Sequence, residues 1–516
     1  MQRREFLATM AVGAMVALMQ ATLSAESSPA EKEKSPHESA SSRKVTILFF
    51  DDQRLNLRDN VVRKLGRPEL IEEAIYKDPH ANAAFGYPRV FRNESNGRWR
   101  MVYQASVPLG GDETFHQVAV VAESEDGLRW KPLDTTGDVK LAKRVVPHQV
   151  LEYESLAEWS TVFVDPFAEP AERLKGLRAK FKYGIAKPGK TMLLVSPDGV
   201  RWRLKEGIEW QNPGADPPVQ VFWNEVRQSY GITTRPDVMD RRIAVMETKD
   251  WENFTQPELA LQPDALDTPL AEAYGMPVLS YEGYYIGLLW LYHPSPQPVP
   301  GSALYRYKGG HVDCRLAYSL NGWHFQRGLR DPFIPNGAPG EPDSGSVYPS
   351  SMVVDGDGSL LIYASACTHE HAHVPPDSGS ILAYRLRRDG FVFLESGGGI
   401  GVVGTRALYW RSGELELNVQ SQGGYARAQI TDHEGVPLEG YGFEECETFS
   451  GDNTAWKPAW KGGKALTMLA NKTIRVEVEL GSARIYAIRG DFIPLTAPQA
   501  RQFEIHGVVP TPRPGF

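Results

Sequence analysis

The sequence of 516 residues predicts an all-β protein, a five-bladed β-propeller followed by a C-terminal antiparallel β-sandwich. Three observations lead to this prediction. A short turn motif recurs along most of the chain, short alternating apolar runs fill the intervals between its copies, and those intervals lack the period of a helix. The 48 glycines and 38 prolines also favour turns over long helices.

The turn motif is Ser-x-Asp-Gly-x-x-Trp, which stands at 124–130 and 196–202. A weaker copy lies at 319–325, and degenerate echoes lie at 248–254 and 388–391. Asp-Gly and Asn-Gly pairs favour a type I′ hairpin because both central residues need positive φ. The copies lie roughly 50 to 70 residues apart, which suits four strands with their loops, so five copies predict five blades.

The first 25 residues are predicted to be an export signal. Arg3 and Arg4 precede an apolar stretch that is too short to span a membrane stably, and small residues follow it near Ala25. This pattern resembles a twin-arginine leader, and a general secretory signal is the alternative. We therefore expect a mature protein in the periplasm or outside the cell, with a polar linker over residues 26–43.

Three further segments follow the linker. We expect the propeller, as the candidate catalytic domain, over residues 44–390, the β-sandwich over 391–495 and a C-terminal tail over 496–516. The sandwich is predicted from short alternating strands that are separated by glycine turns.

The composition excludes several classes of protein. A net charge of -8 without a basic stripe argues against a nucleic-acid partner, and we expect no membrane partner for the mature form. Cys314, Cys367 and Cys446 make neither a disulfide framework nor a zinc-type pair, so we expect buried or loosely placed thiols.

Acidic residues precede each expected inner strand. The inner strands of a propeller begin around one end of a central channel, so these acids are expected to converge there. We select as catalytic carboxylates Asp52, Glu154, Asp216, Glu272 and Asp343, with Glu154 as a candidate acid. Glycosidic cleavage needs one carboxyl group to protonate the leaving oxygen and another to attack or to activate water. For each residue alone, a turn-forming or capping role is the alternative.

Substrate contacts are predicted at Arg235, Tyr274, Tyr348 and His371. A guanidinium can clamp hydroxyl or carboxylate groups, and aromatic rings can stack on sugars. A surface ion pair for the arginine and a place in the core for the aromatic residues are the alternatives.

Three histidines at alternate positions, His369, His371 and His373, would share one face of an extended segment and could hold a divalent metal ion. A polar loop facing the substrate and a solvated turn are the alternatives. No other cofactor motif is present, because the sequence has neither a phosphate loop nor a dinucleotide fingerprint.

The five turns, the aromatic-rich second strands and the trailing sandwich together resemble the furanosidase-type five-bladed propellers of glycoside hydrolase families 32, 43, 68 and their relatives. The resemblance implies three carboxylates, contributed by blades 1 to 3. The family 32 signature W-x-N-D-P-N-G is absent, and the pairs Arg-Asp and Glu-Cys stand outside their family positions, at Arg330-Asp331 and Glu445-Cys446. The chain therefore resembles a distant member.

We predict an exported glycoside hydrolase that cleaves a poly- or oligosaccharide with carboxylates at the propeller funnel. A carbohydrate-binding propeller without catalysis is one alternative. A metal-assisted hydrolase or lyase that uses the segment 369–373 is another. The sequence leaves open the sugar, the linkage, endo or exo action, the stereochemical course and the oligomeric state.

Overall fold

The protein is described by a computed structural model, and the predicted leader and linker lie outside the described residues. The described residues are 44–108, 115–151, 157–180, 189–212, 220–236, 240–295, 309–371, 375–421 and 423–511. They contain thirty strands, four short 3₁₀ turns and one α-helix, so the all-β prediction is confirmed. None of these helical segments is long and apolar enough to cross a bilayer.

Three sheets have four antiparallel strands each, which pair in chain order. The first contains β5 (Arg89–Arg92), β6 (Trp99–Pro108), β7 (Phe115–Ser124) and β8 (Lys131–Pro132). The second contains β9 (Ala157–Val164), β10 (Leu174–Lys180), β11 (Gly189–Ser196) and β12 (Arg203–Asn212). The third contains β13 (Gln220–Asn224), β14 (Ser229–Thr234), β15 (Ile243–Thr248) and β16 (Glu258–Leu261).

A fourth sheet has eight strands and two halves, which meet through a single parallel bridge between Val312 and Ser346. One half contains β17 (Glu272–Gly275), β18 (Val278–Tyr281), β19 (Tyr284–Pro294) and β20 (Gly310–Ser319). The other half contains β21 (Ser346–Val354), β22 (Leu360–Cys367), β23 (Gly379–Leu386) and β4 (Glu69–Leu70). An N-terminal strand thus completes a half whose other strands come more than 270 residues later.

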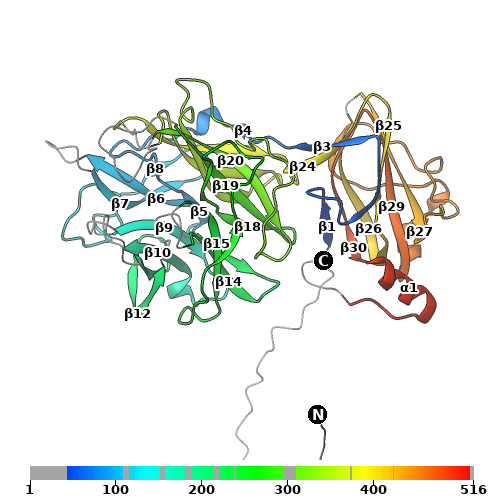
Figure 1. The fold of residues 1–516 in the computed structure, drawn as a ribbon, viewed down its shortest axis with the longest axis horizontal. Coiled ribbons are helices and arrows are strands. Elements are labelled where there is room, and N and C mark those ends of the chain that lie inside the picture. Colours follow the sequence, from blue (N-terminus) through cyan, green and yellow to red (C-terminus); the bar gives the residue numbers. More distant parts are fainter. Residues whose placement is uncertain are drawn as a thin grey trace, which may run out of the picture. The chain divides into compact units, whose positions relative to one another are not determined.

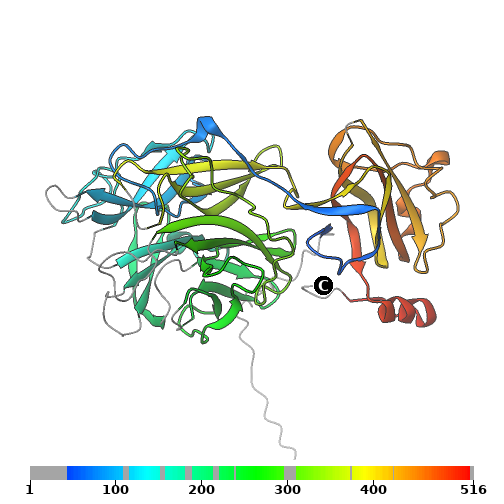
Figure 2. The same cartoon turned by 45° about the horizontal axis from the view of Figure 1, so that its top comes forward.

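The last sheet has ten strands and combines both ends of the described chain. It contains β1 (Val45–Leu48), β2 (Leu55–Asp59), β3 (Val61–Leu65), β24 (Val392–Ser396), β25 (Ile400–Thr405), β26 (Leu408–Gln420), β27 (Tyr425–Asp432), β28 (Asp452–Trp456), β29 (Lys472–Gly481) and β30 (Arg484–Pro494). In Figures 1 and 2 the dark blue N-terminal strands lie among the yellow to red C-terminal ones.

This sheet corrects one predicted boundary. Residues 45–65 were expected in the propeller, but β1 pairs with β30, β2 with β25 and β3 with β24. The C-terminal strands were expected as a sandwich; hydrogen bonds join them into one sheet, and the sandwich stays a prediction. The predicted tail contains α1 (Ala497–His506), which begins at Thr496 with a capping box completed by Gln499.

The recurring turn is built differently from the predicted type I′ hairpin. In the first copy, the Ser124 hydroxyl accepts a hydrogen bond from the Gly127 N–H at 3.0 Å, and the Asp126 carboxylate accepts from the N–H groups of Leu128 and Arg129, both at 2.9 Å. Gly127 has φ +79°, while Asp126 does not have positive φ as type I′ requires. The serine and the aspartate therefore hold the turn through side-chain bonds to its backbone.

Three later copies repeat these bonds, even where the sequence is degenerate. Gly199 and Gly322 also have positive φ and donate to the serine that stands three residues before them. In the echo at 248–254, Trp251 takes the glycine position with φ 64° and donates to the Thr248 hydroxyl at 2.9 Å. The prediction that these segments are equivalent turns is thus confirmed.

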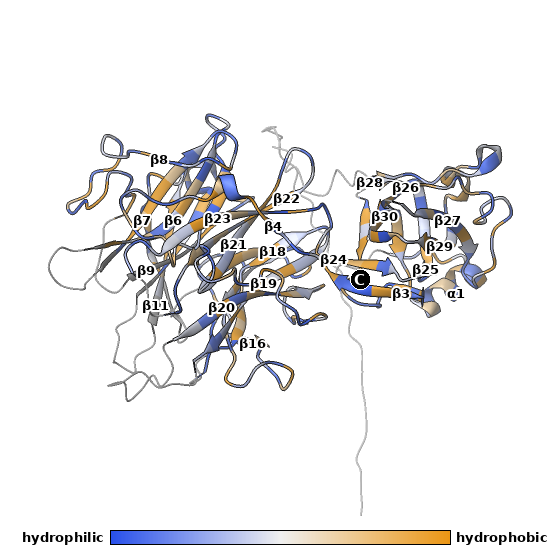
Figure 3. Ribbon diagram, turned by 90° about the horizontal axis from the view of Figure 1, so that it is seen from above, coloured by the Kyte–Doolittle hydropathy of each residue, from blue (hydrophilic) through white to orange (hydrophobic). Residues whose placement is uncertain are grey.

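The fifth echo has a different role. Asp389 is fully buried and accepts hydrogen bonds from the Tyr281 hydroxyl at 2.8 Å and from Arg489 at 2.9 Å. It therefore ties β18 to β30 of the ten-stranded sheet. Apolar residues concentrate on the strands of all the sheets (Figure 3), and the three cysteines are buried and free, as expected.

Candidate active site

A cluster of aromatic side chains lies where several first strands begin. Tyr87 precedes β5, Tyr274 lies in β17 and Tyr348 lies in β21, and they surround Trp290 near the end of β19. Tyr87 stacks on Trp290 with ring centroids 5.0 Å apart, and Tyr348 lies 5.4 Å from Trp290 and 5.7 Å from Tyr274. All four side chains are buried, so they form the floor of the cluster.

Tyr87 occupies an unusual backbone conformation, with φ 41°, which a non-glycine residue rarely adopts. Its N–H donates to the Ser365 hydroxyl at 3.3 Å, and its ring stacks on Trp290. Such local strain is concentrated at functional sites, where the surrounding packing maintains it.

Polar side chains cover this floor. The imidazole Nε2 of His371 lies 3.3 Å from the Tyr274 hydroxyl, and its ring centroid lies 4.7 Å from that of Tyr292. The His371 N–H donates to the Gly310 carbonyl at 2.8 Å, which fixes the loop after β22 against the start of β20.

Two arginines and one carboxylate complete the cluster. Arg235 donates to the Tyr274 carbonyl at 2.7 Å, and its guanidinium lies 4.9 Å from the centre of the Tyr274 ring. Arg241 lies 5.3 Å from the same ring and forms an ion pair with Glu272. The side chains of Arg241 and Glu272 are each 22% exposed, so this pair is accessible to a ligand.

Two tyrosine hydroxyls of the cluster stay protonated. Burial, with smaller contributions from nearby Glu272 and Glu370, raises the pKa of Tyr292, although Arg241 opposes the shift. Burial also raises the pKa of Tyr348 well above its usual value. At neutral pH these tyrosines are neutral hydrogen-bond donors.

The structure brings together five of the residues predicted from the sequence, namely Arg235, Glu272, Tyr274, Tyr348 and His371. Tyr348 is fully buried and Arg235 nearly so, which favours a supporting role for both over direct substrate contact. Sequence reasoning missed Arg241. The signal was present, because Arg241 stands just before β15 at the same end of the sheets as Glu272.

Asp52 lies elsewhere, contrary to the prediction that it joins the other acids. It sits between β1 and β2 of the ten-stranded sheet, where it forms ion pairs with Arg63 and Arg58. Its side chain is 50% exposed. The expectation failed because β1 does not lead into the inner strand of a propeller blade.

The Asp343 carboxylate faces Tyr384 of the main hydrophobic core. It accepts a hydrogen bond from the Tyr384 hydroxyl at 2.7 Å, and the residue is only 5% exposed. Asp343 therefore has a structural role, which was the alternative to catalysis for each acid that precedes a strand. Glu154, Asp216 and His373 lie outside the described residues.

The predicted histidine group is described in part. His369 is exposed, and its Nδ1 lies 2.8 Å from the Thr368 hydroxyl. Within the described ranges, the one group of three side chains with closely spaced metal-ligand atoms is another, formed by His293, His311 and Asp313. A metal at 369–373 therefore stays a prediction.

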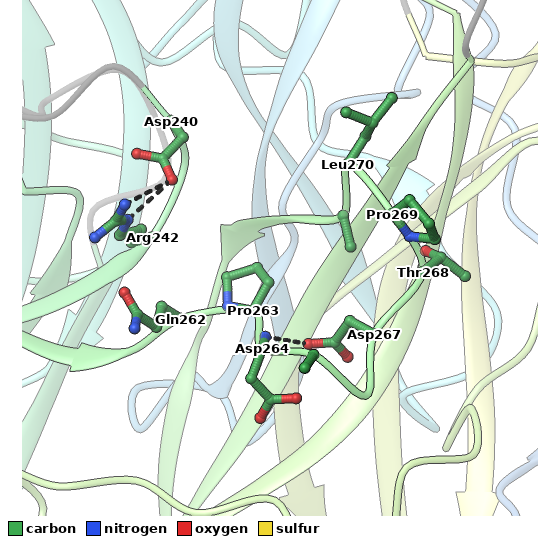
Figure 4. A pocket seen from close by; sticks show the side chains of 11 residues that line it. Asp240, Arg242, Gln262, Pro263, Asp264, Asp267, Thr268, Pro269 and Leu270 are labelled. Carbon is green, nitrogen blue, oxygen red and sulfur yellow. Dashed lines mark hydrogen bonds and ion pairs between the residues drawn. The ribbon is translucent and has the colours of Figure 1, made fainter.

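A surface pocket of about 510 Å³ is lined by chain segments next to Arg241 and Glu272 in the sequence (Figure 4). Its wall includes Asp240 and Arg242, which flank Arg241 in the sequence, and Ala271, which precedes Glu272. The volume falls in the range of small-molecule sites, roughly 300 to 1,000 Å³.

No protein-family model matches the chain, and no curated protein matches its sequence. Solved structures are similar to it at low identity. One is an N-acetylgalactosamine deacetylase from F. plautii in complex with blood group B trisaccharide, with 14% identity over 62% of this chain and 94% of that chain and a TM-score of 0.42.

Two others are an exo-β-1,3-galactanase from Phanerochaete chrysosporium with galactose and a thermostable family-43 glycoside hydrolase. The galactanase has 9% identity over 83% of this chain and 100% of that chain, with a TM-score of 0.39. The family-43 enzyme has 16% identity over 61% and 95%, with a TM-score of 0.38. Family 43 is among those that the sequence resembles, but TM-scores below 0.5 assign no activity to this chain.

Proposed function

We propose that this protein is a glycoside hydrolase that cleaves O-glycosyl bonds of a poly- or oligosaccharide at the aromatic cluster. One observation carries the proposal. Side chains from separate strands and loops converge where β17 and β21 begin, with Glu272, Arg241 and His371 above a floor of tyrosine and tryptophan. Sugar sites combine an apolar ring surface with a few convergent polar groups in this way.

The chemistry assigns different roles to these groups. Glu272 is the carboxylate that attacks the anomeric carbon or activates water, and Arg241 orients it. His371 and Tyr274 contact sugar hydroxyls from the loop side. For the proton donor to the leaving oxygen we propose Asp216 or Glu154, the two acids predicted from the sequence that lie outside the described residues.

The proposal includes a five-bladed propeller. The three four-stranded sheets supply three blades, and the halves of the eight-stranded sheet supply two more, because they share only one bridge. The pairing of β4 with β23 would close the ring, as it joins the beginning of the propeller to its end. Export through the predicted signal would bring the enzyme to extracellular or periplasmic carbohydrate.

A screen of the purified protein against plant and algal polysaccharides and synthetic furanosides and pyranosides, with and without chelator, tests this function. We expect release of reducing sugar, and Glu272→Gln should lower the rate at least about 100-fold. Glu247→Gln is the matched control, because Glu247 is also ion-paired, with Arg227, but on β15 and outside the cluster. Equal rates for both variants would contradict the assignment of Glu272.

A second function is favoured by one observation. Among the predicted carboxylates that the structure describes, only Glu272 lies at the cluster, and hydrolysis needs two. A carbohydrate-binding protein without catalysis would require only the ring surface and the polar groups. Saturable binding of a panel carbohydrate without release, lost on Tyr274→Ala, would support this second function.

A further inference from the structure

The paired strands β19 and β20 place two histidines and an aspartate on one face. His293 is the cross-strand partner of His311, so their side chains point to the same side. Asp313 follows two residues after His311 and shares that side, because side chains alternate along a strand. The ligand atoms of these three side chains all lie within 4.8 Å of one another.

We propose that His293, His311 and Asp313 bind a divalent transition-metal ion of the zinc type. Two imidazole nitrogens and one carboxylate oxygen are the donor set that zinc accepts, and three protein ligands leave a fourth position open for water or substrate. Ligand atoms around a tetrahedral zinc ion are about 3.3 Å apart, given bonds of about 2.0 to 2.1 Å. The His293 Nε2 and an Asp313 oxygen already have this spacing, at 3.2 Å, and the remaining separations, which reach at most 4.8 Å, would have to shorten on binding.

The surroundings hold the His293 ring in place. The His293 Nδ1 lies 2.8 Å from the Thr268 hydroxyl, and its Nε2 lies 3.2 Å from the Asp313 carboxylate. A threonine hydroxyl can donate or accept, so it can pair with Nδ1 in either tautomer. His293 can thus carry its proton on Nδ1 and present the Nε2 lone pair to an ion.

The Arg315 guanidinium orients the Asp313 carboxylate. Arg315 donates to both of its carboxylate oxygens at 2.7 Å, and the Asp313 side chain is only 5% exposed. A carboxylate oxygen has a second lone pair, so an arginine and a metal ion can share it. The same bonds would also stabilise an ion-paired network without a metal, which is the competing explanation.

His311 is the accessible ligand. Its ring stacks on His293 with centroids 4.5 Å apart, yet the residue is exposed.

The site adjoins the pocket of Figure 4. Thr268, whose hydroxyl contacts His293, is part of the wall of that pocket, together with Asp264 and Asp267. An ion held by His293 would therefore lie beside a cavity of about 510 Å³. The proposal does not rest on the glycosidase function, because metal binding is measured directly.

Calorimetric titration of chelator-treated full-length protein with Zn²⁺, and the visible absorption of its Co²⁺ form, test the site. We expect one ion per chain, bound at least tenfold more weakly by His311→Ala and by Asp313→Asn. Thr268→Val should weaken binding about tenfold through the loss of its bond to His293. His369→Ala is the matched control, since it removes an exposed histidine of the segment 369–373 and should bind like the wild type.

Three outcomes would overturn the proposal. Absence of stoichiometric Zn²⁺ binding would leave only the ion-paired network. Loss of binding in His369→Ala but not in His311→Ala would move the metal to the segment 369–373. A Co²⁺ spectrum of the wild type that is unchanged in His311→Ala would also exclude His311 as a ligand, and circular dichroism checks that each variant is folded.

Discussion

Glu272 and Asp343 occupy comparable places in the chain but have opposite surroundings. Both stand at the beginning of a first strand, Glu272 as the first residue of β17 and Asp343 three residues before β21. Glu272 pairs with Arg241 at the accessible cluster, whereas Asp343 is buried against Tyr384. The position in the chain thus brings the backbone to one end of the sheets, and the direction of the side chain decides its role.

The Asp343 environment belongs to the core. Tyr384 lies in the largest hydrophobic cluster, and burial together with the adjacent Asp343 raises its pKa well above the usual value. Its hydroxyl therefore remains a donor to Asp343 at any physiological pH.

Asp343→Ala should cause the largest loss of stability, about 3 kcal/mol, because it leaves the buried Tyr384 hydroxyl without its acceptor and opens space in the core. Urea denaturation measures this loss. Tyr384→Phe removes the same hydrogen bond, so the double variant should lose less than the sum of the two single losses. A loss below about 0.5 kcal/mol would show that Asp343 is not a structural residue.

Gly127→Val should cost about 2 kcal/mol at the turn after β7. Its φ is +79°, and an added Cβ would approach the Tyr363 hydroxyl at 3.1 Å and the Trp99 ring at 3.2 Å. Gly137→Val is the control, since Gly137 has no positive φ and no atom within 4 Å of an added Cβ. Equal midpoints for the two variants in thermal unfolding would refute the turn geometry.

Glu272→Gln should lower stability by less than about 1 kcal/mol, because its ion pair with Arg241 is partly exposed. Its effect should appear in carbohydrate turnover or binding. A loss as large as that of Asp343→Ala in the same urea experiment would make Glu272 a structural acid and remove the contrast.

Substitution of Glu172 should have the smallest effect on stability. Glu172 serves as a reference for an acid that pairs with basic side chains at the surface. A hydrogen bond from Lys205, with another from Arg203, lowers its pKa from 4.5 to about 2. A lowered folded-state pKa stabilises the fold above pH 4.5, and this contribution is lost as the pH falls from 4.5 towards 2.

The stability difference between the wild type and Glu172→Gln should therefore be below about 1 kcal/mol at pH 7 and shrink towards zero across that window. Urea titrations at several pH values measure it. A difference that grows as the pH falls would contradict the direction of the pKa shift.

Much of the architecture could be read from local patterns. The alternating runs predicted strands, and the Ser-x-Asp-Gly motif located four equivalent turns, because both signals act within a few residues. Even the degenerate turn at Trp251 keeps its threonine and aspartate bonds. The type I′ assignment was wrong because the Asp-Gly pair alone does not reveal that side chains satisfy the turn backbone.

The candidate site was recovered in part. Arg235, Glu272, Tyr274 and His371 converge as predicted, since the strand ends that carry them must meet at one end of the sheets. The prediction for Asp52 failed because β1 pairs with β30. A local sequence pattern does not encode a strand pairing between segments that are more than 400 residues apart. His293 and His311 could have been found only from the register of β19 and β20.

The sequence by itself determined the strands, the turns that separate them and the end of the sheets at which acidic and aromatic residues gather, because these depend on neighbours along the chain. Only the tertiary structure decided that the N-terminal strands complete the C-terminal sheet, that Asp343 faces Tyr384, and that Arg241 meets Glu272. Those outcomes depend on which side chains distant segments bury against each other, and burial is a property of the packed whole.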